Sequence, residues 1–197
     1  MIDRLIELDR ELFLFLNGFH TPWMDPAMLF ITNTVAWLPL YLLMLYFIFK
    51  DHGRDGWLVL MGIVLTITLA DQVTAGLMKP YFARLRPSQE PTLEKLIHLV
   101  NGYKGGMYGF ASSHAANTFG AATFFWLLFS RTRKWIWILF LWAAVMTYSR
   151  IYLGVHYPGD IVIGCIVGTL AGIVGFKFYQ WLQKVADKRK SAMSEPE

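Results

Sequence analysis

The sequence has few charged residues and a single cysteine. Charged residues make up 16% of the 197 positions, whereas a soluble domain usually carries about 25%. Hydrophobic residues make up 55%, and the mean hydropathy is +0.40. These values exclude an ordinary soluble domain and favour an integral membrane protein. The lone Cys165 excludes an intrachain disulfide and a cysteine metal cluster.

Two further classes are disfavoured by what the chain lacks. The N-terminal stretch M-I-D-R-L-I-E-L-D-R-E-L is too often charged for the apolar core of a cleavable signal peptide. A net charge of +4 does not predict nucleic-acid binding, because the basic residues flank apolar runs. The length suits one domain. We predict a membrane-embedded domain over 1–183 and a polar, disordered cytoplasmic tail over 184–197.

The apolar runs predict an all-α, integral-membrane helical bundle of about five transmembrane helices. Residues 1–18 have the apolar spacing of an amphipathic helix that lies at the membrane interface and ends at Asn17-Gly18. For Asp71, inside the second span, we expect a structural role. The long connection over 80–113 is expected to contain a short helix over 92–100. The predicted spans are 26–49, kinked at Pro39, then 56–79, 115–130, 135–153 and 158–182.

Alternating crossings bring the ends of four predicted spans to one membrane face. The second and fourth spans end there, and the third and fifth begin there. Their uncharged runs are short for a bilayer, so their polar ends lie near the depth of lipid phosphates. The residues that converge in this way are Lys79, Arg86, His114, Arg150, His156 and Asp160.

The stretch S-R-I-Y-L-G-V-H-Y-P-G-D at 149–160 carries the clearest chemistry. Pro158 suits the first position of a helix, and the Asp160 carboxylate can then reach back toward His156. Such a contact fixes the imidazole tautomer and leaves its other nitrogen as base or nucleophile. Arg150 and the free amides of the helix start favour a phosphate. The alternative, that His156 and Asp160 only cap a helix, does not predict the convergence of the other residues.

Three segments together resemble the type 2 phosphatidic acid phosphatase family, the membrane branch of the lipid phosphatase and vanadium haloperoxidase superfamily. Its motifs are K-x6-R-P, P-S-G-H and S-R-x5-H-x3-D. The first is matched at 79–87 and the third at 149–160. The second reads A-S-S-H at 111–114, where Ala111 stands for the proline and Ser113 for the glycine.

The resemblance implies a role for each matched residue. His156 would attack phosphorus and form a phosphohistidine, and Asp160 would orient it. His114 would protonate the departing oxygen and later activate water. Ser149 matches the motif without a role that we can derive. No metal or other cofactor is expected. The residues implied to bind the phosphate oxygens are Lys79, Arg86, Ser112, Ser113 and Arg150.

The resemblance leaves several lipid substrates open. Small bacterial members act on undecaprenyl diphosphate, phosphatidylglycerol phosphate or lipid A phosphates. We place undecaprenyl diphosphate first and lipid A second, because a small enzyme without an added domain suits a simple tail-anchored pyrophosphate. Cations of the long loop, Arg84, Lys95 and Lys104, suit an anionic headgroup. A transporter is the alternative from another class, disfavoured because the chain has no visible inverted repeat. A haloperoxidase is disfavoured because those relatives are soluble.

Charge placement predicts the orientation. Once the three cations assigned to phosphate are set aside, more cations lie on the face opposite the site. The positive-inside rule then places the site on the outer, periplasmic face of the inner membrane. The expected partners are a lipid phosphate and the bilayer, without nucleic acid.

Overall fold

The computed structural model describes residues 2–194, and every regular element within that range is a helix. The predicted all-α class is therefore confirmed. A π-helical stretch, η3 (Gln72–Met78), links α4 to α5. The α-helices are α1 (Ile2–Asn17), α2 (Met24–Thr32), α3 (Leu38–His52), α4 (Gly56–Asp71), α5 (Lys79–Phe82), α6 (Ser113–Phe129), α7 (Ile138–Tyr152) and α8 (Pro158–Ser194).

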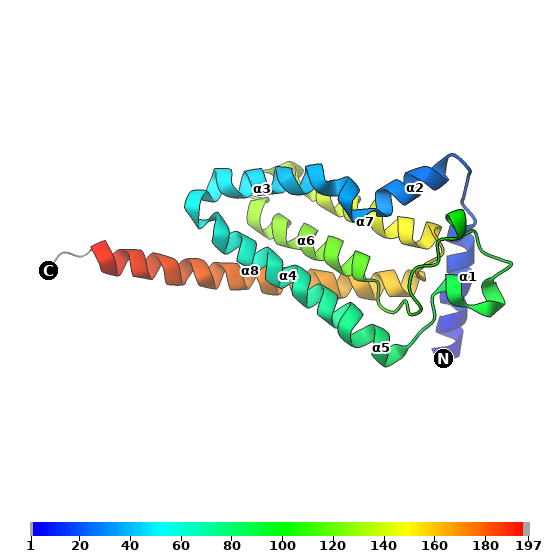
Figure 1. Ribbon diagram of the computed structural model, residues 1–197. Coiled ribbons are helices and arrows are strands. Elements are labelled where there is room, and N and C mark those ends of the chain that lie inside the picture. The colour runs from blue at the N-terminus through cyan, green and yellow to red at the C-terminus, as the bar shows by residue number, and fades with distance from the viewer. Residues whose placement is uncertain (1, 195–197) are drawn as a thin grey trace.

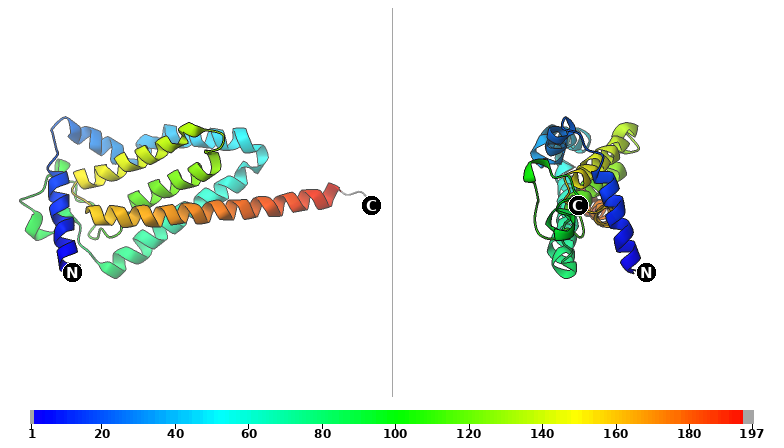
Figure 2. Two further views of the ribbon diagram at one scale, coloured as in Figure 1. Left: turned by 180° about the vertical axis from the view of Figure 1, so that it is seen from behind. Right: turned by 90° about the vertical axis from the view of Figure 1, so that its right-hand side faces the viewer.

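The helices α3, α4, α6, α7 and α8 run lengthwise beside one another, and α1 lies across one end of them (Figures 1 and 2). Successive lengthwise helices run in opposite directions. The end of α5, the start of α6, the end of α7 and the start of α8 therefore meet at the end that α1 crosses (Figure 1). We call this the α1 end. The opposite end contains the α3–α4 and α6–α7 turns.

Small residues allow α8 to pack closely against α6. A β-carbon added at Gly168 would lie 2.1 Å from the Ala116 carbonyl oxygen, and one added at Gly172 would lie 2.6 Å from the Gly120 carbonyl oxygen. Glycines four residues apart let helix backbones approach in a membrane, where packing rather than hydrophobic burial drives association. This contact fixes the start of α6 beside the start of α8.

The end of α1 is anchored by one buried side chain. The Asn17 side-chain amide donates hydrogen bonds to the carbonyl oxygens of His98, Ile151 and Tyr152, and its oxygen accepts one from the His98 amide. Because every polar atom of this buried amide has a partner, the contact is stabilising. It ties α1 to the end of α7 and to the long α5–α6 connection.

By length and composition alone, three helical stretches could cross a membrane: Thr34–Phe82, Lys134–Tyr152 and Pro158–Ala192. The first contains the reversal at Gly53–Asp55 and so comprises two lengthwise helices (Figure 1). The central helix α6, with 17 residues, is shorter than these stretches. The number of five transmembrane helices stays a prediction.

The first predicted span, 26–49, does not have the predicted kink at Pro39. It is instead broken between α2 and α3, before Pro39. The side chain of Asn33 accepts a hydrogen bond from the Val35 amide and diverts the chain into a 3-10 turn, η1 (Thr34–Trp37). Pro39 then lies in the first turn of α3, where its missing amide hydrogen costs nothing.

Two other predictions are wrong. Residues 92–100 do not form an α-helix: the 3-10 turn η5 (Pro91–Leu93) gives way to turns, because Asn17 takes the backbone hydrogen bonds of His98. The tail is not disordered over 184–194, because α8 continues to Ser194. Its residues there favour helix, and Lys190 forms an ion pair with Asp55. Residues 195–197 lie outside the described range.

Candidate active site

The turn between α7 and α8 places His156 against Asp160. Pro158 begins α8, as predicted, and Asp160 lies in its first turn. One carboxylate oxygen, Oδ2, accepts a hydrogen bond from the Tyr157 amide at 3.0 Å and lies 3.3 Å from Nδ1 of His156. The Gly109 backbone also accepts a hydrogen bond from the ring. With Nδ1 protonated by these contacts, Nε2 keeps a free lone pair.

His156 is 1% exposed. Burial lowers the pKa of its imidazole well below 6.5, and the nearby cations Arg86, Arg150 and Lys79 lower it further. The ring is therefore neutral at pH 7. A neutral imidazole is the form that can act as a nucleophile or base.

The start of α6 supplies the second imidazole. Ser112 is the N-cap of α6, and its hydroxyl oxygen accepts a hydrogen bond from the Ala115 amide. The Ser112 amide donates to the Asp160 carbonyl oxygen at 3.0 Å, which joins the starts of α6 and α8. His114, on the first turn of α6, lies within electrostatic range of His156 and Arg150. The two imidazoles therefore belong to one cluster of charged and titratable groups with Lys79, Arg86 and Arg150, called the pocket below.

Two buried guanidinium groups in this pocket lack partners for some of their donors. Arg86 is 8% exposed and donates through Nε to the Tyr108 carbonyl oxygen, while its Nη1 has no partner among the described residues. Arg150 is 3% exposed; it donates to Thr32 and Tyr103, and its Nε has no such partner. Buried unpaired donors are costly, and a phosphate would satisfy them. Burial, with the neighbouring charge of Arg150, lowers the pKa of Arg86.

Ser113 replaces the glycine of the family motif and contacts the third cation. Its hydroxyl oxygen accepts hydrogen bonds from Lys79 Nζ at 2.8 Å and from the Thr74 hydroxyl at 2.9 Å. A glycine could supply only its backbone here. The substitution therefore gives Lys79 an anchor. Asp71 interacts electrostatically with Lys79. The Phe110–Ala111 peptide bond, beside the other substituted position, is cis.

The glycine-rich segment 101–109 lies close against the pocket. A β-carbon added at Gly109 would lie 3.0 Å from Asp160 Oδ2, and one added at Gly105 would lie 2.6 Å from Arg86 Nη1. The Tyr103 hydroxyl lies 3.4 Å from two nitrogens of Arg150. The glycines of this segment let the backbone approach the cations and the His156–Asp160 pair, where a side chain would not fit.

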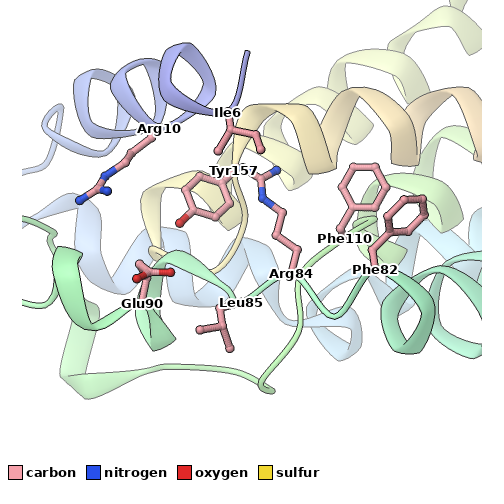
Figure 3. A pocket seen from close by; sticks show the side chains of 8 residues that line it. All are labelled: Ile6, Arg10, Phe82, Arg84, Leu85, Glu90, Phe110 and Tyr157. Carbon is pink, nitrogen blue, oxygen red and sulfur yellow. The ribbon is translucent and has the colours of Figure 1, made fainter. Parts of the chain in front are cut away.

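Sequence reasoning missed Arg84, which contacts Asp160, and Asp9, which contacts Arg84. Arg84, interpreted as a headgroup cation, instead donates through Nη1 to Asp160 Oδ1 at 3.0 Å and through Nη2 to Asp9 at 2.8 Å. Figure 3 shows Arg84 and Leu85 on opposite sides of their segment. Alternation in an extended segment puts Arg84 on the side of Arg86, and this signal could have found it. Nothing in the sequence indicated Asp9.

A cavity of about 580 Å³ adjoins this contact (Figure 3). Phe82 and Phe110 lie on one side of it, and Arg10 and Glu90 on the other, with Arg84 and Tyr157 between them. Burial raises the pKa of the Tyr157 hydroxyl to about 12, so the residue is neutral. The cavity is amphipathic and lies where α1 meets the starts of the site segments.

The structure thus brings together all eight residues predicted for the site: His114, His156, Asp160, Lys79, Arg86, Ser112, Ser113 and Arg150. A carboxylate-bonded neutral imidazole, a second imidazole and unpaired cationic donors are the parts that phosphoryl transfer requires. The fold is that of a helical membrane protein, and the site has the groups that a phosphate-transferring enzyme needs.

Comparison with known proteins specifies this class. The family model of the PAP2 superfamily matches residues 57–184, and the chain belongs to this superfamily. It is 41% identical over 199 residues to a lipid A 4′-phosphatase of Bacteroides thetaiotaomicron. The alignment covers 100% of this chain and 86% of that protein. It is 31% identical to an undecaprenyl-diphosphatase of Sulfolobus acidocaldarius, over 81% of this chain and 72% of that protein.

A solved structure gives the same result. The crystal structure of Aquifex aeolicus LpxE superimposes with a TM-score of 0.67 at 28% identity, covering 86% of this chain and 95% of that one. The protein is therefore a membrane enzyme, a lipid phosphatase of the PAP2 superfamily. The resemblance stated from the three motifs is confirmed.

Proposed function

We propose that this protein removes a phosphate from lipid A, with the 4′-phosphate as the group removed. The observation that carries the proposal is the 41% identity, along the whole chain, to a protein named lipid A 4′-phosphatase. This reverses the order of substrates predicted from the sequence, which placed undecaprenyl diphosphate first. The second candidate is kept because an undecaprenyl-diphosphatase is 31% identical.

The chemistry we propose has two steps. His156 Nε2 attacks phosphorus in line, the bond from phosphorus to the sugar oxygen breaks, and His114 gives that oxygen a proton. Water, deprotonated by His114, then attacks the phosphohistidine, and inorganic phosphate leaves. Asp160 orients His156 throughout. The residues that hold the nonbridging oxygens are Lys79, Arg86, Arg150, Ser112 and Ser113.

The pocket suits a metal-independent reaction. Its three cations already neutralise a phosphate and oppose a divalent cation. We expect phosphate release to continue in EDTA, and a strict requirement for Mg²⁺ would contradict this mechanism.

A substrate panel tests the function. Purified protein in detergent would receive bis-phosphorylated lipid A, undecaprenyl diphosphate and phosphatidylglycerol phosphate, with inorganic phosphate and the mass of the product lipid measured. The expected result is the highest kcat/KM on lipid A with loss of the 4′-phosphate, and no release by His156→Gln. Preferred hydrolysis of undecaprenyl diphosphate would overturn the substrate, and full activity of His156→Gln would overturn the nucleophile.

We propose one membrane-embedded domain over 1–183 in the inner membrane, with the site on its outer face. The support is the excess of cations on the other face. Lys104→Cys, at the exposed loop beside the site, should react with an impermeant thiol reagent in intact cells. Arg131→Cys, at the opposite end, should react only after lysis. The reverse pattern would place the site in the cytosol, and unsubstituted protein controls for Cys165.

A further inference from the structure

We propose that Asp9 and Arg84 are positioning residues that hold the Asp160 carboxylate and tune the basicity of His156. This inference rests on the proposed function of the His156–Asp160 dyad. It assigns part of the active site to α1, which lies outside the residues matched by the family model, 57–184.

The contacts form an unbroken chain from α1 to the nucleophile. Asp9 accepts from Arg84 Nη2 at 2.8 Å, Arg84 Nη1 donates to Asp160 Oδ1 at 3.0 Å, and Asp160 Oδ2 lies 3.3 Å from His156 Nδ1. The other oxygen of Asp9, Oδ1, accepts from the Gly159 amide at 2.7 Å. Asp9 therefore holds both the arginine and the first turn of α8.

Packing fixes the guanidinium in this bridge. The Arg84 guanidinium carbon lies 4.0 Å from the centre of the Tyr157 ring, and the two side chains lie together in Figure 3. The Arg84 side chain is 24% exposed and that of Asp160 is 0% exposed. A planar cation stacked on a ring loses little freedom when it bonds two carboxylates. Arg84 thus fixes Asp160 in one orientation.

The contacts of Arg84 with Asp9 and Asp160 also determine how strongly the negative charge of Asp160 acts on His156. Arg84 shares its positive charge between Asp9 and Asp160. Removal of Asp9 would leave that charge to Asp160 alone and weaken the hold of Asp160 on the imidazolium form. Removal of Arg84 would do the opposite. The other charged or titratable groups that face His156 are His114, Lys79, Arg86 and Arg150, and neither substitution touches them.

The two substitutions should therefore shift the His156 pKa in opposite directions. Arg84→Gln is expected to raise it by about one unit, and Asp9→Asn, which keeps an oxygen for the Gly159 amide, to lower it by about half a unit. In both variants kcat is expected to fall several-fold and KM to stay near wild type, because the hydrogen bonds of both residues go to protein groups. Arg84→Lys keeps the cation and should return the pKa toward wild type.

The pKa is read in two ways. Histidine-labelled protein in detergent is titrated by NMR, with the His156 signal assigned by its loss in His156→Gln, and the acid limb of kcat/KM is measured on lipid A. Glu11→Gln removes the same charge from an exposed position of α1 and should leave both unchanged. The NMR titration needs no substrate, so absence of wild-type phosphate release would count against the proposed function and not this inference. The inference would be overturned if the His156 pKa shifted in the same direction in Arg84→Gln and Asp9→Asn. It would also be overturned if this pKa stayed at its wild-type value in both Arg84→Gln and Arg84→Lys.

Discussion

In the described part of the chain, three cations at the α1 end lack the carboxylate partners that Arg133 and Lys190 have at the opposite end of the helix bundle. At the opposite end, Arg133 forms two hydrogen bonds to Asp51 and lies over the Phe47 and Phe129 rings. Lys190 pairs with Asp55 in solvent. At the α1 end, three buried or half-buried cations face one pocket, and none forms an ion pair with a carboxylate within residues 2–194. They are Lys79, Arg86 and Arg150.

We infer from this difference that the paired cations are structural and that the unpaired ones serve the proposed site. An exposed pair contributes little to stability and needs no ligand. Buried like charges are costly and persist where a bound anion repays them. The contrast predicts that substitutions at one end change activity and at the other end only stability.

The largest expected effect comes from Arg86→Met. Loss of a donor to the transition-state oxygens should lower kcat/KM about 100-fold. The melting temperature should stay near that of wild type, because removal of the unpartnered Nη1 donor offsets loss of the hydrogen bond from Nε to the Tyr108 carbonyl oxygen. Arg133→Met is the matched control: activity stays within about twofold, and stability falls by about 1 kcal/mol or less. Loss of activity in Arg133→Met would contradict this difference between the two ends.

The second-largest expected effect is on the stabilisation of the protein by a bound anion, which should depend on the α1 end and not on the opposite end. Vanadate at about 100 times its Kd should stabilise wild type by about 2.7 kcal/mol, visible as a higher melting temperature in detergent. Arg133→Met should show the same rise and Arg86→Met a much smaller one. Equal rises in both variants would mean that vanadate binds outside this pocket.

The pH profile depends on the lowered pKa of His156. Since the neutral ring is the reactive form, the acid limb of kcat/KM should lie below pH 6.5 and activity should persist there. In the unfolded chain His156 binds a proton near pH 6.5, whereas in the folded state it stays neutral at that pH. Its contribution to stability is therefore complete above pH 6.5 and is lost as the pH falls toward the folded-state pKa. An acid limb at or above 6.5 would contradict the burial argument.

The smallest effect is expected for Ser113→Gly, which restores the residue of the family motif. Lys79 would lose one hydrogen bond, worth about 1 kcal/mol or about fivefold in kcat/KM. Ser130→Gly, at the far end of α6, should leave kcat/KM unchanged. An increase in activity with Ser113→Gly would show that the anchor holds Lys79 away from the phosphate.

Much of this site followed from sequence because it depends on topology. Alternating crossings require the ends of spans beside Lys79, His114, Arg150 and His156 to meet, whatever the details of packing. Asp160 lies close to His156 in sequence, so local geometry was enough to join them. The motif at 79–87 also fixed Arg86, although not the direction of Arg84.

What sequence did not reveal depends on contacts between distant segments. Asp9 reaches Gly159 across 150 positions, and no periodicity of α1 distinguishes it from other acidic residues on that helix. The turns over 94–99 replaced a predicted helix because Asn17 takes the hydrogen bonds of His98. The spacing of four between Gly164, Gly168 and Gly172 is typical of close helix packing, and this signal could have indicated the contact between α8 and α6.

The proposed reaction requires that phosphate is transferred through His156 at the α1 end. The direct test is to mix labelled lipid phosphate with the enzyme, quench in base, where phosphohistidine survives, and locate the label by mass spectrometry. We expect transient label on His156 and none in His156→Gln. Label on another residue, or full turnover in His156→Gln, would contradict it.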